Sequence, residues 1–364
     1  MKNPSPLHIL QICSSSATSG AERHVYSLST KLQKRGHQVS VATPGHGWLT
    51  SILEQDSIPV ARTRMKGTGW FRTVGMLTRL VRRNKVQVIH AHLTRSAYIG
   101  YLVGMVTGVP VITSVHIANH DQIYRRLARR KNRLVAVSNF VAGMLHGQGV
   151  PERYIDTIYN GTDFIDIEAT ESTPSLEELG VPRDRRIVGL IGKVCRDKGQ
   201  VEMIHAMGAI REQHPDAHLL LVGRLDEDYR GDIDRAIAES GTQERVTLTG
   251  VRHDIPALLD AFTLSTLPSR METFGVAAIE AMARGKAVVA SKVGALPEVV
   301  RHGSTGLLVD LRPESIAEAV SYLLRNDGER EEMGRRGRML VEQKFSLAEM
   351  ATRFESVYRR AATE

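Results

Sequence analysis

Short apolar runs alternate with amphipathic helical stretches along almost the whole chain, and this alternation constrains the fold more than any other feature. In the first half the apolar runs are residues 7–13, 38–42, 86–90, 109–114, 133–137 and 155–159. The second half repeats the rhythm at residues 187–191, 219–222, 246–249, 263–267, 288–290 and 306–309. Strands separated by helices predict parallel, doubly wound sheets. We therefore expect an α/β protein with two Rossmann-like domains and a ligand crevice between them, at the carboxyl ends of the strands.

The length of 364 residues suits two domains that each have a core of their own. Residues 166–186, between the two halves, are rich in Glu, Ser, Thr and Pro and are typical of a linker with a short helix. Residues 347–360 carry apolar side chains at helical spacing. The expected parts are therefore residues 1–168, residues 169–345 and a terminal helix in residues 346–364.

Composition restricts the class of protein. The hydrophobic fraction of 42% and the charged fraction of 24% are those of an ordinary globular protein. No apolar run reaches the length of a membrane span, and no signal-peptide core follows the first lysine, so we expect a cytoplasmic protein. Cys13 and Cys195 are expected to be two buried free thiols rather than one disulfide. The net charge of +8 suits an anionic donor, an anionic membrane surface or nucleic acid.

The sequence does not favour a nicotinamide-dependent enzyme. The first strand is followed by the residues SSSATSGAE, which contain no G-x-G-x-x-G fingerprint. Gly189, Gly192 and Gly199 also have the wrong spacing for a pyrophosphate-binding turn.

Two acidic residues stand out near the last third of the chain, in the run LPSRMETFGVAAIEAMARGKAVVAS at residues 267–291. Glu272 follows a predicted buried strand and precedes a predicted helix that begins near Gly275. Free N–H groups at a helix start attract phosphate or sugar oxygens. Glu280 lies in the second turn of the same helix, so both carboxylates are placed to bind one polyhydroxylated ligand. The structural alternative is a helix start with one capping acid and one exposed acid.

This run resembles the donor-site signature of retaining glycosyltransferases with the GT-B fold, specifically glycosyltransferase family 4. The chain departs from the family pattern at Thr273-Phe274, although the phenylalanine and glycine positions match, and at Lys286-Ala287, where alanine replaces proline. The resemblance implies that Thr273, Phe274 and Gly275 belong to the donor site with Glu272 and Glu280.

Further segments are similar to the same family, and together the likeness spans nearly the whole chain. Gly20 matches a glycine loop that opens a helix, where a missing Cβ lets backbone N–H groups approach a phosphate. His116 matches the histidine that faces the donor sugar. The segment GKVCRDKG at residues 192–199 resembles a loop that presents two cations to the diphosphate, here Lys193 and Lys198. Lys193 replaces the usual arginine and loses its planar fork, which Arg196 could supply.

Other matches are weaker. Arg252 follows a strand where relatives hold the nucleotide base, and residues 160–163 resemble a family N-G-x-D turn. His90 and His92 would lie on one face of a strand and suggest a metal pair. No acidic or cysteine partner is placed near them, and the family generally needs no metal, so these two histidines are expected at most to line the cleft.

The resemblance implies transfer of a sugar from a UDP- or GDP-linked donor to an acceptor hydroxyl with retention at the anomeric carbon, without a metal or other cofactor. Lys193, Lys198 and helix N–H groups would stabilise charge that grows on the diphosphate. Glu280 would bind ribose hydroxyls and Glu272 the transferred sugar, with His116, Lys198 and Glu272 as the catalytic set. The first domain would be the acceptor side, and the terminal helix would return to it.

Two other functions stay open: a sugar-nucleotide epimerase or hydrolase on the same fold, and a non-catalytic basic scaffold. The basic residues of segment 124–133, with those of segment 62–72, favour peripheral association with the cytoplasmic leaflet, where lipid-linked or lipopolysaccharide acceptors are built. An ordinary solvated helix face is the alternative. Nucleic acid is not expected as a partner, because aromatic residues make up only 5% of the chain and no recognition motif occurs.

Overall fold

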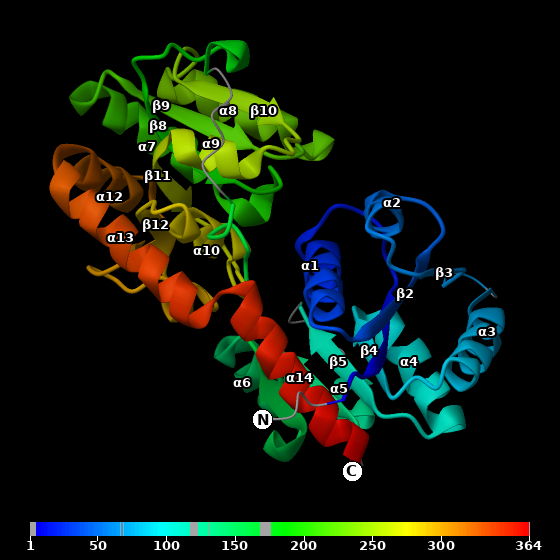
Figure 1. Cartoon of the computed structure of the whole chain (residues 1–364). Coiled ribbons are helices and arrows are strands. Elements are labelled where there is room, and N and C mark those ends of the chain that lie inside the picture. Colours follow the sequence, from blue (N-terminus) through cyan, green and yellow to red (C-terminus); the bar gives the residue numbers. More distant parts are fainter. Residues whose placement is uncertain are drawn as a thin grey trace. The chain divides into compact units, whose positions relative to one another are not determined.

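The structure, a computed structural model, describes residues 5–65, 67, 69–116, 123–129, 131–167 and 176–363. The chain divides into two compact units, residues 1–160 with 347–364 (unit 1) and residues 161–346 (unit 2). The division falls at residue 160 rather than near 168. Each unit is built around one parallel sheet with helices between its strands (Figure 1). The predicted pair of doubly wound α/β sheets is confirmed.

Unit 1 holds a seven-stranded parallel sheet in the order β3-β2-β1-β4-β5-β6-β7. Its strands are β1 His8–Cys13, β2 Gln38–Pro44, β3 Val60–Thr63, β4 Val88–His92, β5 Val111–Val115, β6 Arg133–Ala136 and β7 Ile155–Thr157. Its helices are α1 Gly20–Lys34, α2 Trp48–Gln55, α3 Gly69–Arg83, α4 Thr94–Thr107, α5 Ile123–Leu127, α6 Asn139–Gly147 and α14 Leu347–Thr363, with a 3₁₀ turn η1 Glu152–Tyr154. The sequence did not predict β3, because this four-residue edge strand has no apolar run and is only partly buried.

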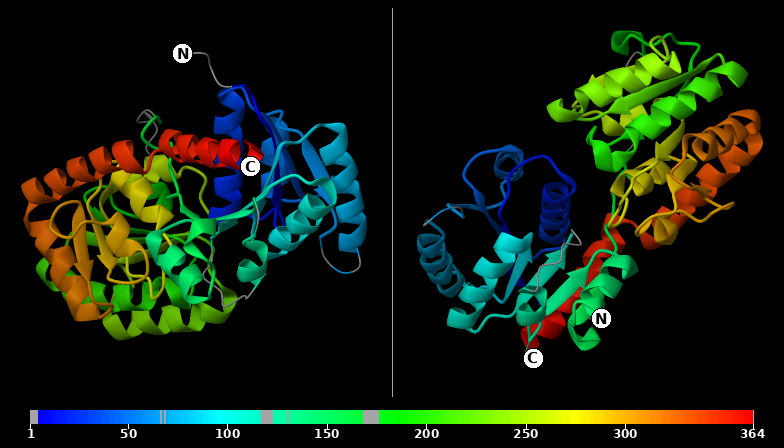
Figure 2. Two further views of the ribbon diagram at one scale, coloured as in Figure 1. Left: turned by 90° about the horizontal axis from the view of Figure 1, so that it is seen from below. Right: turned by 180° about the vertical axis from the view of Figure 1, so that it is seen from behind.

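Both faces of the unit 1 sheet are buried, as expected for parallel strands between helices. Ile9 of β1 packs in a cluster with Leu28 of α1 and with α14, whereas its neighbour Leu10 packs with α3 and α4 on the other side. The terminal helix α14 contributes Phe354 and Tyr358, both fully buried, to the first cluster. This helix, red in Figure 2, therefore belongs to the core of unit 1.

Unit 2 holds a six-stranded parallel sheet in the order β10-β9-β8-β11-β12-β13. Its strands are β8 Arg186–Ile191, β9 Ala217–Val222, β10 Val246–Gly250, β11 Phe262–Leu267, β12 Val288–Ser291 and β13 Gly306–Val309. Its helices are α7 Gln200–Gln213, α8 Arg230–Ser240, α9 Ile255–Ala261, α10 Val276–Ala283, α11 Leu296–Val299, α12 Pro313–Arg325 and α13 Asp327–Lys344, with 3₁₀ turns η2 Leu176–Leu179, η3 Arg196–Lys198 and η4 Glu227–Tyr229.

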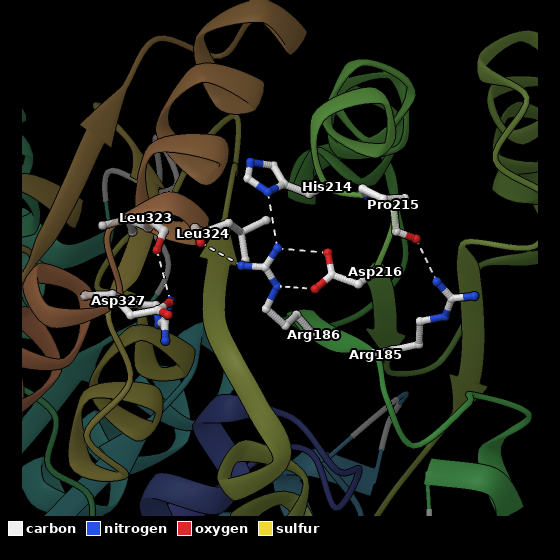
Figure 3. A network of polar contacts seen from close by, with 9 residues as sticks. Arg185, Arg186, His214, Pro215, Asp216, Leu323, Leu324 and Asp327 are labelled. Atoms are coloured by element: carbon white, nitrogen blue, oxygen red, sulfur yellow. Dashed lines mark hydrogen bonds and ion pairs between the residues drawn. The ribbon is translucent and has the colours of Figure 1, made fainter.

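A polar network holds the amino end of β8 in unit 2 (Figure 3). Arg186 makes a two-pronged contact with Asp216, with nitrogen–oxygen distances of 2.5 and 2.8 Å, and donates to the carbonyl of Leu324 at 2.6 Å. These contacts join the starts of β8 and β9 to α12. They lie at the amino ends of the strands, at the edge of the sheet opposite the carboxyl ends.

The two cysteines lie in different units, and both are free thiols. Cys13 ends β1 and is fully buried, and burial raises the pKa of its thiol to about 12. Cys195 lies in the loop after β8 and is only half-buried, so the expectation of a buried thiol is wrong for this residue.

The strand order of each unit reverses at one place, where neighbouring strands leave in opposite directions. In unit 1 this place lies between β1 and β4, and in unit 2 between β8 and β11. Doubly wound sheets bind ligands at the carboxyl ends of the strands on either side of such a switch point. The loops after these four strands are therefore the first place to look for a site.

Candidate active site

The loops that follow β8 and β11 are fastened to each other at the switch point of unit 2. Gly199 has φ +71°, and a Cβ added to it would lie 1.8 Å from the carbonyl oxygen of Pro268. Only glycine allows that approach. The backbone N–H of Arg270 also donates to the carbonyl of Asp197 at 2.8 Å. The two predicted donor-site segments are thus neighbours in space.

Lys198 and Glu272 meet where these loops join. The ammonium Nζ of Lys198 lies 2.5 Å from Oε2 of Glu272, and the hydroxyl of Ser269 donates to the same oxygen at 3.3 Å. The two charged side chains are 26% and 14% exposed. The alternative of a capping acid at the helix start is not observed, because an ammonium and a hydroxyl hold the Glu272 carboxylate and the N-cap of α10 makes no side-chain hydrogen bond. A cation and an anion therefore lie at the carboxyl edge of the unit 2 sheet, and both are partly exposed to a ligand.

A third loop, which follows β12, completes this site and was not predicted. The N–H of Ala295 donates to the backbone carbonyl of Glu272 at 2.9 Å. The hydroxyl of Ser291 donates to the backbone carbonyl of Ser269 at 2.5 Å. Gly294 has φ +53°, and a Cβ on it would lie 2.0 Å from the same Glu272 oxygen. A glycine just before a Pro-containing helix start, directly after a buried strand, is the sequence signal that could have identified this loop.

The start of α10 places the remaining residues of the predicted donor segment. Gly275, with φ +100°, is the N-cap, and Thr273 before it is half-buried. Glu280 is 8% exposed in the second turn, so the alternative of an exposed surface acid is excluded. Phe274 is only 2% exposed, and its ring packs against Phe345 with 5.8 Å between centroids. The Phe274 side chain is therefore part of the core rather than a group presented to a ligand.

The other predicted cations of unit 2 are each engaged by an aspartate. The pairs are Lys193 with Asp226, Arg196 with Asp232 at 3.0 Å, and Arg252 with Asp254 through two contacts of 2.9 and 2.5 Å. The carboxylate of Asp254 raises the pKa of Arg252. Arg196 is 75% exposed and lines a surface pocket with Tyr229 and Arg235. The structure thus brings Lys198 to Glu272 but pairs Arg196 elsewhere.

In unit 1 the predicted residues Gly20 and His116 lie at the carboxyl edge of the sheet. Gly20 is the first residue of α1, and a Cβ on it would meet no heavy atom within 4 Å. His116 follows β5, and its Nε2 lies 3.2 Å from Nδ1 of His92, the last residue of β4. Burial lowers the pKa of His116 to about 4, so this imidazole is neutral near pH 7.

His116 is half-buried and lies against a group of buried imidazoles that the sequence revealed only in part. His90 and His92 lie in β4 with ring centroids 3.9 Å apart, and α1 adds His24. Burial lowers the pKa of all three well below the usual value. His92 has imidazole neighbours from other parts of unit 1, and both His90 and His92 are fully buried rather than exposed to a cleft. The signal missed for His24 is its helical spacing from Leu28, which places it on the buried face of α1.

Comparisons with known proteins agree with this arrangement. Residues 18–164 match the model of Glycosyltransferase Family 4, and residues 172–339 match that of Glycosyl transferases group 1. The D-inositol 3-phosphate glycosyltransferase of Corynebacterium glutamicum is 30% identical over 393 residues, which cover 94% of this chain and 92% of that protein.

Solved structures share the fold over nearly the full length of the chain. A glycosyltransferase from Rickettsia africae superposes with a TM-score of 0.88 at 21% identity and covers 98% of this chain and 99% of its own. Anabaena Alr3699/HepE in complex with UDP-glucose superposes with a TM-score of 0.85 at 24% identity, with 96% and 98% covered. The chain is therefore a glycosyltransferase of family 4 type with the two-domain GT-B fold.

Proposed function

We propose that this glycosyltransferase moves a sugar from a nucleotide-sugar to an acceptor hydroxyl with retention at the anomeric carbon. The observation that carries the proposal is the Lys198–Glu272 pair at the switch point of the unit 2 sheet. Two helices, α7 and α10, begin directly after the loops that bear these residues. Their free N–H groups and the ammonium provide positive charge for a diphosphate, while the carboxylate accepts hydrogen bonds from sugar hydroxyls.

The same groups act on the transition state. Negative charge grows on the diphosphate as the glycosidic bond breaks, so Lys198 and the helix N–H groups stabilise the transition state more than the ground state. When the Lys198 ammonium pairs with the diphosphate instead of with Glu272, the Glu272 carboxylate is free to bind the transferred sugar. The acceptor hydroxyl attacks the anomeric carbon from the face that the phosphate leaves, and a phosphate oxygen takes its proton. This route requires no protein nucleophile and no metal ion.

The other predicted residues have supporting roles in this proposal. Glu280 accepts the ribose hydroxyls, with Thr273 and Gly275 beside it at the start of α10. Lys193 and Arg252 contact the diphosphate and the base from the loops after β8 and β10. In unit 1, Gly20 is proposed to bring the α1 N–H groups to a phosphate, and the neutral His116 to hydrogen-bond a sugar hydroxyl.

Donor transfer is tested with UDP- and GDP-linked hexoses, beginning with UDP-glucose, in the presence and absence of a saccharide acceptor. Transfer to the acceptor with the anomeric configuration preserved, judged by product NMR, supports the proposal. Full activity in the presence of EDTA supports the metal-independent route. Inversion of configuration contradicts retention, and release of free sugar irrespective of acceptor indicates a hydrolase instead.

We further propose that the acceptor is built at the cytoplasmic leaflet, in bacterial cell-surface polysaccharide or lipopolysaccharide synthesis. Unit 1 supports peripheral binding at α3, where Phe71 is 64% exposed and stacked on Trp70, next to the exposed Arg72. In the basic segment 124–133, Arg125 and Arg126 lie exposed on α5. No helix among the described residues is long and apolar enough to cross a bilayer.

Three of the basic residues that the sequence placed on this membrane-binding surface do not support it in the structure. Arg133 begins β6 and is bound to Asp156 at 2.5 Å, so it does not belong to an exposed basic face. Lys66 and Arg130, which the sequence placed in the same basic surface, lie outside the described residues. Vesicle co-sedimentation tests the rest: Phe71→Ser with Arg72→Gln should release the protein from anionic vesicles at low salt, since each cation contributes about 1 kcal/mol there. Equal binding to neutral and anionic vesicles contradicts the proposal.

A further inference from the structure

Three imidazole rings meet at the carboxyl edge of the unit 1 sheet. His24 comes from α1, His92 ends β4 and His116 follows β5, and one ring nitrogen of each lies within 4.8 Å of the others. The ring centroid of His24 is 5.4 Å from that of His92 and 4.8 Å from that of His116. His24 and His92 are 7% and 0% exposed. Three nitrogen donors from three separate segments thus converge in one unit, two of them on buried rings and the third on the half-buried His116.

The hydrogen-bond partners of His92 determine which of its nitrogens carries the proton. Ser29 donates its hydroxyl to the carbonyl of Val25 at 2.7 Å, so the same hydroxyl accepts from the amide nitrogen of Gln11 at 2.7 Å. The amide oxygen of Gln11 then faces Nε2 of His92 at 2.8 Å. An amide oxygen can only accept, so neutral His92 is protonated at Nε2. Its Nδ1 therefore bears a lone pair, 3.2 Å from Nε2 of His116.

His24 is oriented in the same way by a different amide. Its Nδ1 lies 2.9 Å from the side-chain oxygen of Asn160, which again can only accept, so the proton is on Nδ1 and the lone pair on Nε2. That Nε2 is buried and has no hydrogen-bond partner among the described residues. A buried polar atom without a partner costs stability, and such an exception needs a reason. A bound metal ion, which accepts a lone pair, would be such a reason.

His90 shows what a satisfied histidine looks like in the same place. Its Nε2 lies 2.8 Å from the hydroxyl of Ser114, and its Nδ1 lies 2.6 Å from the hydroxyl of Tyr358 on α14. Both nitrogens are engaged, so His90 offers no lone pair to the group. It packs against His92 as a structural neighbour, and the binding set is limited to the other three rings.

We propose that His24 Nε2, His92 Nδ1 and His116 Nε2 bind one divalent transition-metal ion of the Zn²⁺ class. Neutral imidazoles suit Zn²⁺, Co²⁺, Ni²⁺ and Cu²⁺, and disfavour Mg²⁺ and Ca²⁺, which prefer oxygen ligands. Histidine ligands usually donate their other N–H to a carbonyl or carboxylate, as His92 does to Gln11 and His24 to Asn160. Three ligands leave a fourth position for water.

The distances are compatible with a four-coordinate ion. With metal–nitrogen bonds of about 2.0–2.1 Å, tetrahedral ligands lie about 3.4 Å apart. The His92–His116 nitrogens, at 3.2 Å, already have this separation. The ring nitrogens of the three residues lie within 4.8 Å of one another, so His24 must approach the other two by a distance on the order of 1 Å, and His116 must carry its proton on Nδ1. This ion is additional to the transfer reaction, which the proposed route performs without a metal.

Metal binding is tested on the full chain, purified without a histidine tag and stripped of metal. Titration with Co²⁺ should give one saturable equivalent with the intense visible absorption of a four-coordinate ion, and Zn²⁺ should displace it. His24→Phe and His92→Phe keep a ring among these aromatic neighbours and should each weaken binding more than about 100-fold. Asn160→Ala should weaken it about 10- to 100-fold, the usual range for loss of a supporting partner. His146→Asn, at an exposed position on α6, is the control and should not change it.

Two results would overturn this site. One is the absence of saturable Co²⁺ absorption, and the other is unchanged affinity in His24→Phe, which would place the ion elsewhere. Circular dichroism of each variant checks folding. If His92→Phe does not fold, X-ray absorption of the zinc-loaded wild-type protein decides: three coordinated imidazoles support the site, and fewer than three contradict it. Neither measurement depends on glycosyl transfer, so failure of the transfer proposal leaves this result readable.

Discussion

The two units carry the same kind of sheet but opposite chemistry at its carboxyl edge. In unit 1 the edge is occupied by neutral, buried imidazoles, with His24, His90 and His92 at most 7% exposed. In unit 2 the edge is occupied by charge pairs, with Lys198 and Glu272 26% and 14% exposed. A buried ring without charge is held by fixed hydrogen bonds, whereas a half-exposed ion pair exchanges partners readily. Under the proposed function, the unit 2 edge would neutralise charge, and the unit 1 edge would contribute uncharged hydrogen-bonding groups.

The largest expected effect is on kcat, when the positive charge of Lys198 is removed from the carboxyl edge of the unit 2 sheet. Lys198→Ala should lower kcat by about 100- to 1,000-fold, the usual result of deleting one preorganised donor to a developing negative charge. Steady-state kinetics measures it, with Lys34→Ala, at an exposed position of α1, as the matched control. Wild-type turnover in a folded Lys198→Ala protein would remove this lysine from the mechanism.

Acid should destabilise unit 1 more than unit 2. His24, His90, His92 and His116 have folded-state pKa values below the unfolded value of about 6.5, so the unfolded chain binds more protons as the pH falls. Their contribution to stability is fully present above pH ~6.5 and is lost below it, by on the order of 1 kcal/mol per histidine per pH unit. In unit 2, burial lowers the pKa of His218 to about 4, and burial also lowers that of His214.

Tryptophan fluorescence separates the two units in this experiment. The chain has two tryptophans, Trp48 on α2 and Trp70 on α3, both in unit 1. Urea titrations of metal-free protein at pH 7 and pH 5, followed by this fluorescence, should show unit 1 losing stability, and hydrogen exchange should show a smaller loss in unit 2. His24→Phe should reduce the pH dependence of unit 1. A pH-independent fluorescence midpoint contradicts the assignment of neutral buried rings.

A third prediction joins the two proposals for unit 1 and depends on both. If His116 contacts the donor sugar and also binds an ion, then Zn²⁺ should inhibit transfer, and EDTA should restore it. His24→Phe should be inhibited less than wild type at the same Zn²⁺ concentration, because the ion loses a ligand. Equal inhibition of the two proteins would show that Zn²⁺ acts elsewhere.

Truncation of Glu280, the buried acid on α10, should have a moderate effect on the affinity for the nucleoside diphosphate. Glu280→Ala should weaken binding of the nucleoside diphosphate by about 1–3 kcal/mol, the scale for losing a charged hydrogen-bond partner. Calorimetric titration with UDP and GDP measures it, and Glu318→Ala, on the exposed side of α12, controls for loss of a helical glutamate. Unchanged affinity would place the ribose away from α10.

The smallest effect is expected at the loop after β8. Lys193 is 43% exposed and paired with Asp226, and Lys193→Arg keeps the charge and adds a planar fork. The change in diphosphate affinity should be about 1 kcal/mol or less, towards tighter binding. A large loss of affinity would instead show that the compact ammonium is required at this position.

The sequence by itself determined the two doubly wound sheets, because strand and helix periodicities are local and persist along the chain. It also predicted, from segments that carry a family pattern, that Lys198 and Glu272 lie close together, and their 2.5 Å contact is observed. A donor site that includes Glu280 stays a prediction. Only β3, which is short and lacks an apolar run, escaped prediction among the strands of the described residues.

Only the tertiary structure determined which residues contact each other at the carboxyl edges of the two sheets. Strand order places the loop after β12 against Glu272, and it pairs the side chain of Arg196 with Asp232. It also brings His24 to His92, which lies in a different element far along the chain. Such contacts depend on strand order, register and the closure of long loops, which no short-range pattern encodes.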